Sequence, residues 1–165
     1  MSALPVVGVE RRVRAGWLPG ARDLRRWAAA ALGARAGGRE ISVLLVGPAR
    51  SRRLNARYRG RDRPTNVLSF PAPGAVQAAG LLGDLVICPA VLRAEARAQR
   101  KSARAHWAHL VVHGVLHLAG YDHEKERDAR RMERREIRVL RALGIANPYR
   151  ASVPPRSASK QRRAR

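Results

Sequence analysis

The strongest constraint on this chain is the segment from His113 to His123, which reads HGVLHLAGYDH and has the pattern H-x-x-x-H-x-x-G-x-x-H. All five histidines of the protein lie between His106 and His123. Residues four positions apart share one face of an α-helix, so His113 and His117 can direct both imidazoles at one ion. Gly120 suits the end of that helix, because glycine adopts the left-handed conformation without a Cβ clash. The chain can then fold back and bring His123 to the same ion.

Three histidine ligands favour a catalytic zinc site. Zinc binds imidazole nitrogen at about 2.0–2.1 Å, and catalytic zinc combines three protein ligands with an open fourth position. We therefore predict one Zn²⁺ per chain on His113, His117 and His123, although nickel or another imidazole-binding ion fits the same ligands. His109 offers a rival set with His113 and His117, but its outer members would stand roughly 12 Å apart along the axis. We expect His109 to pack beside the site and His106 to lie on another face.

Gly114 separates this segment from the zinc proteases. In the pattern H-E-x-x-H the glutamate is the general base of the protease, and Gly114 occupies its position here. The ligands are present and the protease base is missing, which counts against peptide hydrolysis.

The charge of the chain points to a polyanionic partner. The net charge is +22, and 31 of the 34 basic residues are arginine. Removing the residues from Pro154 onward deletes five basic residues and no acidic one, so the remaining body still carries +17. A basic body of this size is typical of a protein that binds nucleic acid.

The remaining composition indicates a cytoplasmic protein. No run approaches the 18 or so apolar residues of a membrane span. The start, Met1 to Pro5, lacks the charged head and apolar block of a signal peptide. Cys88 is the only cysteine, which excludes an internal disulfide and favours a reducing compartment.

Hydrophobic periodicity predicts four strands and five helices. The strands are expected over residues 6–9, 41–46, 66–70 and 81–88, and the helices over 22–32, 49–58, 91–100, 103–119 and 124–143. The strand over 81–88 is too apolar for a wet face, so we place it centrally in the sheet. Trp27 and Trp107 lie on helical patterns and are expected in the core. The Pro-, Ala- and Gly-rich residues 71–80 are expected to form a mobile connection.

This order predicts an α+β fold: a single domain in which a small mixed β-sheet of about four strands packs against a central metal-bearing helix and flanking helices. We expect the domain to span residues 1–150. Residues 151–165 are expected to be a disordered Arg-rich tail that either contacts RNA or is only solvated.

The chain resembles the YbeY family of bacterial endoribonucleases and ribosomal RNA maturation factors. The histidine segment looks like that family's signature, and two further segments match it: YRGRDRPTNVLSFP over residues 58–71 and LGDLVIC over residues 82–88. With Leu143-Gly144 and the Asn147-Pro148-Tyr149 ending, the likeness covers roughly residues 41–149. Three motifs in the right order are highly specific. One departure is Asn66, where many members carry aspartate.

The resemblance implies zinc on His113, His117 and His123, cleavage of single-stranded RNA, and maturation of small-subunit ribosomal RNA, notably at its 3′ end. It also implies a role in ribosome quality control, with the small subunit and its proteins as partners. The family's important arginine falls on Arg59, which would neutralise charge on the phosphate in the transition state. Asp122 either orients a histidine or acts as a base, or it only caps the following helix.

Two other functions stay open from the sequence. The first is a non-enzymatic ribosome-assembly factor, in which zinc ties the last helix to the central one and RNA binding is the activity. The second is a metallohydrolase of another substrate, which the missing glutamate disfavours. Asp84 is expected to satisfy backbone donors rather than to approach the metal.

Overall fold

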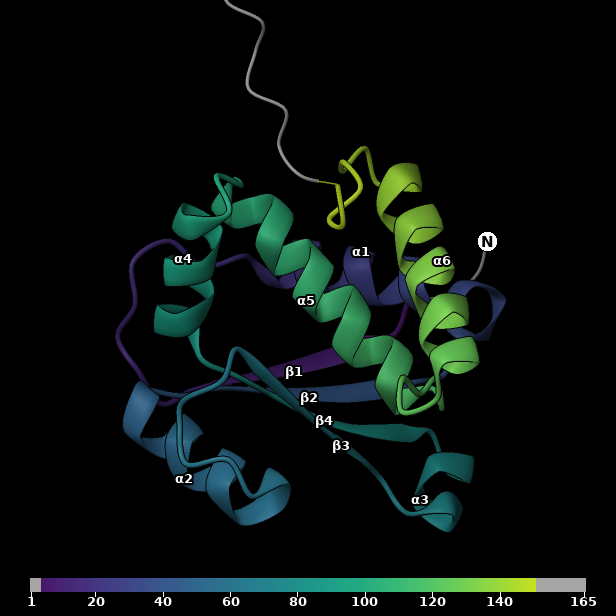
Figure 1. Ribbon diagram of the computed structural model, residues 1–165. Coiled ribbons are helices and arrows are strands. Elements are labelled where there is room, and N and C mark those ends of the chain that lie inside the picture. Colours follow the sequence, from purple (N-terminus) through teal and green to yellow (C-terminus); the bar gives the residue numbers. More distant parts are fainter. Residues whose placement is uncertain (1–3, 151–165) are drawn as a thin grey trace, which may run out of the picture.

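The computed structural model describes residues 4–150 of the chain, and the predicted tail over 151–165 lies outside them (Figure 1). Four strands form one sheet: β1 (Val6–Arg11), β2 (Glu40–Leu45), β3 (Val67–Pro71) and β4 (Leu81–Ile87). Their order in the sheet is β1-β2-β4-β3. β1, β2 and β4 run parallel, and β3 runs antiparallel to β4 at the edge. The sheet is therefore mixed, and β4 lies inside it as predicted.

The helices are α1 (Ala21–Leu32), α2 (Pro48–Arg59), α3 (Gly74–Ala78), α4 (Pro89–Ala98), α5 (Ala103–Leu118) and α6 (Glu126–Ala142), with a 3₁₀ turn at Gly33–Arg35. α5 crosses one face of the sheet, with α1, α4 and α6 around it, while α2 lies on the opposite face (Figure 1). None of the helices in the described part is long and apolar enough to cross a membrane. The predicted α+β architecture around a central helix is confirmed.

The main core lies between the sheet and α5. α5 is apolar on almost every side, and a helix of this kind is stable only when other elements surround it. Trp107 of α5 and Trp27 of α1 are both buried in this core, as their helical patterns predicted. The core fixes α5 against the sheet and so fixes the residues at its end.

A smaller core holds α2 on the other face. Val46, Leu68 and Val86 form its centre, and Leu54 of α2 packs against them. α2 is otherwise strongly basic, so this narrow contact leaves most of its arginines exposed. The C-terminal end of α2 lies beside β3, where Tyr58 packs edge-on against Phe70.

The connection over residues 71–80 contains the short helix α3, whose Gln77 donates to the carbonyls of Leu82 and Leu118, so this segment is not a plain loop. Asp84 is exposed and lies on the face of β4 opposite Leu85, whose side chain packs toward α5. Asp84 is also not among the residues that line the pocket of His113, His117 and His123.

Candidate metal centre

The end of α5 and the turn after it position the three histidines of the signature. The Oγ of Ser102 accepts a hydrogen bond from the Ala105 amide at 3.1 Å, so α5 begins at the predicted cap. Gly120 then adopts a φ of 96°, in the region where glycine avoids a Cβ clash. The chain turns back there and carries His123 to the face of α5 that presents His113 and His117.

Imidazole nitrogens of these three residues converge on one point. The Nε2 atoms of His113 and His117 are 3.2 Å apart, and the Nδ1 of His123 lies 2.9 Å from the Nε2 of His117. All three ligand atoms lie within 4.8 Å of one another. Nitrogens bound to one tetrahedral zinc at about 2.05 Å stand roughly 3.3 Å apart, so the spacing fits a single ion. The predicted ligand set is thus brought together.

The outer nitrogens of two of these histidines have acceptors that set their tautomers. The Nδ1 of His117 donates to the Tyr121 carbonyl at 2.9 Å, and the Nδ1 of His113 contacts the carboxylate of Glu136. Each Nε2 is then left with a lone pair for a metal. Burial, together with the neighbouring His113 and His123, lowers the pKa of His117 to about 4, so this imidazole is neutral at physiological pH.

Glu136 of α6 connects the metal centre to the end of the described chain. Its buried carboxylate contacts His113 through one oxygen, and through the other it accepts from the Tyr149 hydroxyl and lies 3.4 Å from His109. Burial alone would raise the pKa of Glu136, but the contacts with His109 and His113 outweigh it and bring the pKa to about 2. Burial and the adjacent carboxylate raise the pKa of Tyr149 above its usual range. Glu136 is therefore an ionised acceptor.

The two remaining histidines of α5 lie where the helical spacing placed them. His109 packs beside the site, and its ligand atom groups with those of His113 and Glu136 rather than with His117. The rival set of His109, His113 and His117 is not assembled. His106 lies apart and contacts Glu95 at 2.8 Å.

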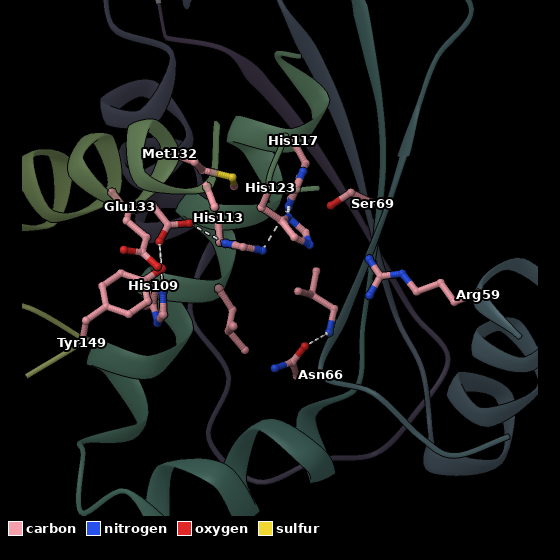
Figure 2. Close-up of a pocket in the computed structure, with 14 residues that line it drawn as sticks. Arg59, Asn66, Ser69, His109, His113, His117, His123, Met132, Glu133 and Tyr149 are labelled. Atoms are coloured by element: carbon pink, nitrogen blue, oxygen red, sulfur yellow. Dashed lines mark hydrogen bonds and ion pairs between the residues drawn. The ribbon is translucent and has the colours of Figure 1, made fainter. Parts of the chain in front are cut away.

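Arg59 reaches the same pocket from α2. The histidine signature opens onto a cavity of about 420 Å³, whose lining includes Arg59, Asn66, Ser69, Glu133 and Tyr149. Figure 2 shows the Arg59 side chain extending from α2 toward β3 and the histidine cluster. Partial burial and the nearby Arg61 lower the pKa of Arg59, which nonetheless stays protonated, because an arginine keeps its charge in proteins. The pocket thus combines three clustered imidazoles that could hold a metal ion with a cation.

Gly114 faces the sheet and not the pocket. A Cβ at this position would lie 2.8 Å from the Cδ2 of Leu85 and 3.3 Å from the Oγ of Ser69. α5 therefore packs so closely on β3 and β4 that any side chain at this position would displace the end of the Leu85 side chain. Packing therefore favours glycine here, which gives a physical reason for the absence of the protease base.

Asp122 serves the backbone of the turn that carries His123. Its Oδ1 accepts from the amides of His123 at 2.6 Å and Glu124 at 3.2 Å. These bonds lower the pKa of its carboxyl group. The capping residue of α6 is Lys125, so Asp122 does not cap that helix. Asp122 is exposed and is not among the residues that line the metal pocket.

Sequence reasoning missed Glu136 and Tyr149. The signal for Glu136 was its place in α6, four residues after Met132 and four before Leu140, both buried. An acidic residue on the apolar stripe of an amphipathic helix needs a partner inside the protein. Tyr149 belonged to a matched motif but carried no pattern that pointed to the histidines.

The fold and the site define a class: a single-domain α+β protein with a cluster of three histidines that could hold a metal ion, beside an arginine. The family model described as Endoribonuclease YbeY matches residues 21–144. The chain belongs to this family, as the three sequence motifs indicated.

Individual relatives agree with that assignment. An Endoribonuclease YbeY from Alkalilimnicola ehrlichii is 51% identical over 154 residues, which cover 88% of this chain and 93% of that protein. One from Halorhodospira halophila is 50% identical over 135 residues, or 79% of this chain and 88% of that protein. The solution structure of a Thermotoga maritima protein shares the fold, with a TM-score of 0.53 and 24% identity over 88% of this chain and 99% of that one.

Proposed function

We propose that this protein is a zinc-dependent endoribonuclease that cleaves single-stranded RNA during maturation of the small-subunit ribosomal RNA, notably at its 3′ end, and that it acts in ribosome quality control. Its partners would be ribosomal RNA and the small ribosomal subunit, and its location the cytoplasm. Membership of a family named for endoribonuclease activity supports the reaction.

The observation that carries the proposal is the shared pocket of Arg59 and the three histidines. An arginine fork binds phosphate oxygens through paired N–H donors, and a partly desolvated position strengthens that attraction. The net charge of +22 supports a polyanionic substrate over a peptide. Gly114 stands where a zinc protease carries its glutamate base, and the close approach of Leu85 favours a glycine there.

His113, His117 and His123 would hold one Zn²⁺, with Glu136 and the Tyr121 carbonyl keeping two of the rings in place. When bound, the ion supplies Lewis-acid polarisation of a phosphoryl oxygen or activation of water. Arg59 would bind the same phosphate and offset the charge that builds on it in the transition state. For Asp122 we keep the role of base as a hypothesis and favour the role of holding the His123 turn.

A non-enzymatic function is the alternative. His123 precedes α6, and His113 and His117 belong to α5, so a bound ion would tie these two segments together. A zinc-stabilised RNA-binding factor in ribosome assembly would need no more than this link and the basic surface.

Cleavage of a single-stranded ribosomal RNA precursor separates the two functions. We would compare the wild type with His117→Ala and Arg59→Glu, and with Arg53→Glu as a matched control. Arg53 lies exposed on the same helix and does not line the metal pocket. The wild type and Arg53→Glu should cleave, while the other two variants lose about 100-fold or more, as expected when a main charge-stabilising group is removed.

Metal analysis belongs in the same experiment. About one zinc per chain is expected in the wild type and in Arg59→Glu, and none in His117→Ala. If the wild type and both pocket variants bind RNA and cleave it equally, the enzymatic function is rejected in favour of the assembly factor.

A further inference from the structure

β3 forms one wall of the metal pocket and has a free edge. Within residues 4–150 its only partner in the sheet is β4, and no strand of that part of the chain pairs with its other side. Val67 and Ser69 of β3 line the pocket together with Arg59. In Figure 2, Arg59 approaches Ser69 from α2, while the histidines lie on the side of α5. The free edge therefore borders the place where a phosphate would meet both Arg59 and the metal site.

The register of β3 decides which of its amides face outward. The Cys88 amide donates to the Asn66 carbonyl and the Ala72 amide donates to the Leu82 carbonyl, each at 2.9 Å. In an antiparallel pair the hydrogen-bonded positions alternate, so the backbone groups of residues 66, 68, 70 and 72 point at β4. Those of residues 67, 69 and 71 point away from the sheet.

Two of these three outward positions offer no free donor. The Val67 amide donates to the Oδ1 of Asn66 at 2.6 Å, and Pro71 has no N–H. Ser69 keeps its amide, and its hydroxyl donates to the Gly114 carbonyl at 3.3 Å instead of turning back onto the edge. Among the described residues of this edge, the Ser69 N–H is thus the one outward donor left, and it lies beside the pocket.

A single open donor does not suit an added β-strand. Strand pairing needs donors at alternate positions, and the positions on either side of Ser69 supply none. One N–H next to an arginine suits a compact anion with several acceptor oxygens, which is the shape of a phosphate. The charge of the chain favours the same kind of ligand.

We propose that the Ser69 backbone N–H donates a hydrogen bond to a non-bridging oxygen of the scissile phosphate, which is then held between the edge of β3 and the Arg59 guanidinium. This inference rests on the proposed nuclease function and adds a positioning group to it. A backbone donor is fixed by the sheet, so it orients the phosphate at no cost in side-chain entropy.

Proline at position 69 tests the donor directly. Ser69→Pro removes an N–H that takes no part in the ladder with β4, and proline is tolerated at such edge positions. Ser69→Ala is the matched reference, since both variants lack the hydroxyl. We expect kcat/KM for a single-stranded RNA to be at least about tenfold lower in Ser69→Pro than in Ser69→Ala, given that one lost oxyanion donor costs roughly 10²–10³-fold in a well-studied hydrolase.

An amide-to-ester replacement covers the case in which the proline variant fails to fold. Lactic acid in place of residue 69 differs from Ser69→Ala only by an oxygen for the N–H, and it should show a similar loss. Zinc content and thermal unfolding are measured on all variants and should match those of Ser69→Ala within error. If both replacements cleave RNA as fast as Ser69→Ala, the inference is wrong.

A binding readout keeps this inference separate from the nuclease function. In protein labelled with ¹⁵N-serine, a 2′-deoxy oligonucleotide that resists cleavage should move the Ser69 amide proton downfield, and the shift should weaken in Arg59→Gln. If the wild type cleaves no RNA, the proposed function fails, and the amide shift alone then decides whether Ser69 binds phosphate. A Ser69 resonance unmoved at saturating oligonucleotide rejects the contact.

Discussion

Two carboxylates, Glu136 and Glu95, contact histidines of α5, and their closest pairs differ in which partner is buried. In the pair of Glu136 and His113, the carboxylate is 0% exposed and the imidazole is 28% exposed. In the pair of Glu95 and His106, the imidazole is 4% exposed and the carboxylate 32%. The two pairs use the same chemistry in opposite orientations.

The orientation determines what each histidine can do. His113 donates inward to Glu136, which leaves its Nε2 directed at His117 and the pocket. The Nε2 of His106 contacts the Glu95 carboxylate, and its Nδ1 is buried without a partner among the described residues. Glu95 also accepts from the Nδ2 of Asn66 at 3.0 Å, so this pair joins α4, α5 and the start of β3. One pair orients a histidine of the candidate metal centre, and the other supports a wall of the pocket.

Of the changes that would test this comparison, one in the pair of Glu136 and His113 should have the largest effect, and that effect is on metal affinity. Glu136→Gln exchanges an ionised acceptor for a neutral amide, which weakens the hydrogen bond that fixes His113. We expect zinc affinity to fall by roughly 10- to 100-fold, as is typical when the partner of a metal-bound histidine is changed. Competition with a chromophoric chelator measures the affinity.

Glu95→Gln is the matched control for that measurement. It makes the same change in the other pair, which contacts no histidine of the metal cluster. Its zinc affinity should equal that of the wild type. A comparable loss in both variants would mean that the pairs do not differ in function.

Acid should destabilise the metal-free protein in two steps. His117 has a folded pKa of about 4 against an ordinary value of 6.5, so stability is lost as the pH falls from 6.5 to about 4, while the unfolded chain alone takes up the proton. Glu136 has a folded pKa of about 2 against 4.5, so its contribution is present above pH 4.5 and disappears toward pH 2. Urea unfolding with a chelator present, at pH 7, 5 and 3, measures both steps.

Substitution of His117 and of Glu136 shows which residue causes each of the two acid-dependent losses of stability. His117→Ala should flatten the change in unfolding free energy between pH 7 and pH 5, and Glu136→Gln should flatten the change between pH 5 and pH 3. A profile that is the same in both variants and the wild type would show that other groups control the acid response.

The pair of Glu95 and His106 should affect stability at neutral pH. Glu95→Ala leaves His106 and the Asn66 amide without their shared acceptor. Loss of hydrogen bonds to a charged acceptor costs about 1–3 kcal/mol, so the free energy of unfolding should fall by that amount. Chemical denaturation of zinc-saturated protein measures it, and a zinc affinity within error of the wild type separates this effect from the metal site.

Much of the fold could be predicted from the sequence because its patterns are local. Ser102 and the apolar run after it predicted α5, and the apolar composition of β4 predicted its central place. The two tryptophans on helical patterns were expected in the core and are buried. The short helix α3 was missed, since proline, alanine and glycine in residues 71–80 are typical of a connection.

The three histidines of the candidate site could also be predicted, because His113, His117 and His123 are close in sequence. Glu136 was not predicted, since its contact with His113 spans 23 positions and depends on how α6 packs on α5. The sequence showed Gly114 only as a missing base, and the approach of the Leu85 side chain shows that packing also favours glycine there. The outward amide of Ser69 depends on strand register, which residue patterns alone do not give.

Asp122 extends the comparison to a third carboxylate, one that contacts backbone instead of an imidazole. Asp122→Ala removes the acceptor for the His123 and Glu124 amides, but the group is exposed and water can replace it. The His123 turn should loosen, and zinc affinity should fall only a few-fold, because water replaces the exposed carboxylate as acceptor for both amides. The chelator competition used for Glu136 measures this as well.

Asp122→Asn distinguishes a structural role from a catalytic one. The amide keeps an oxygen for the two backbone donors but cannot take up a proton as a carboxylate base does. If Asp122 only shapes the turn, the variant should cleave RNA and bind zinc as the wild type does. A fall in kcat of about 100-fold with unchanged zinc affinity would instead identify Asp122 as the general base. Such a result would assign this third carboxylate to proton transfer, in contrast to Glu136, which orients a ligand, and Glu95, which supports the fold.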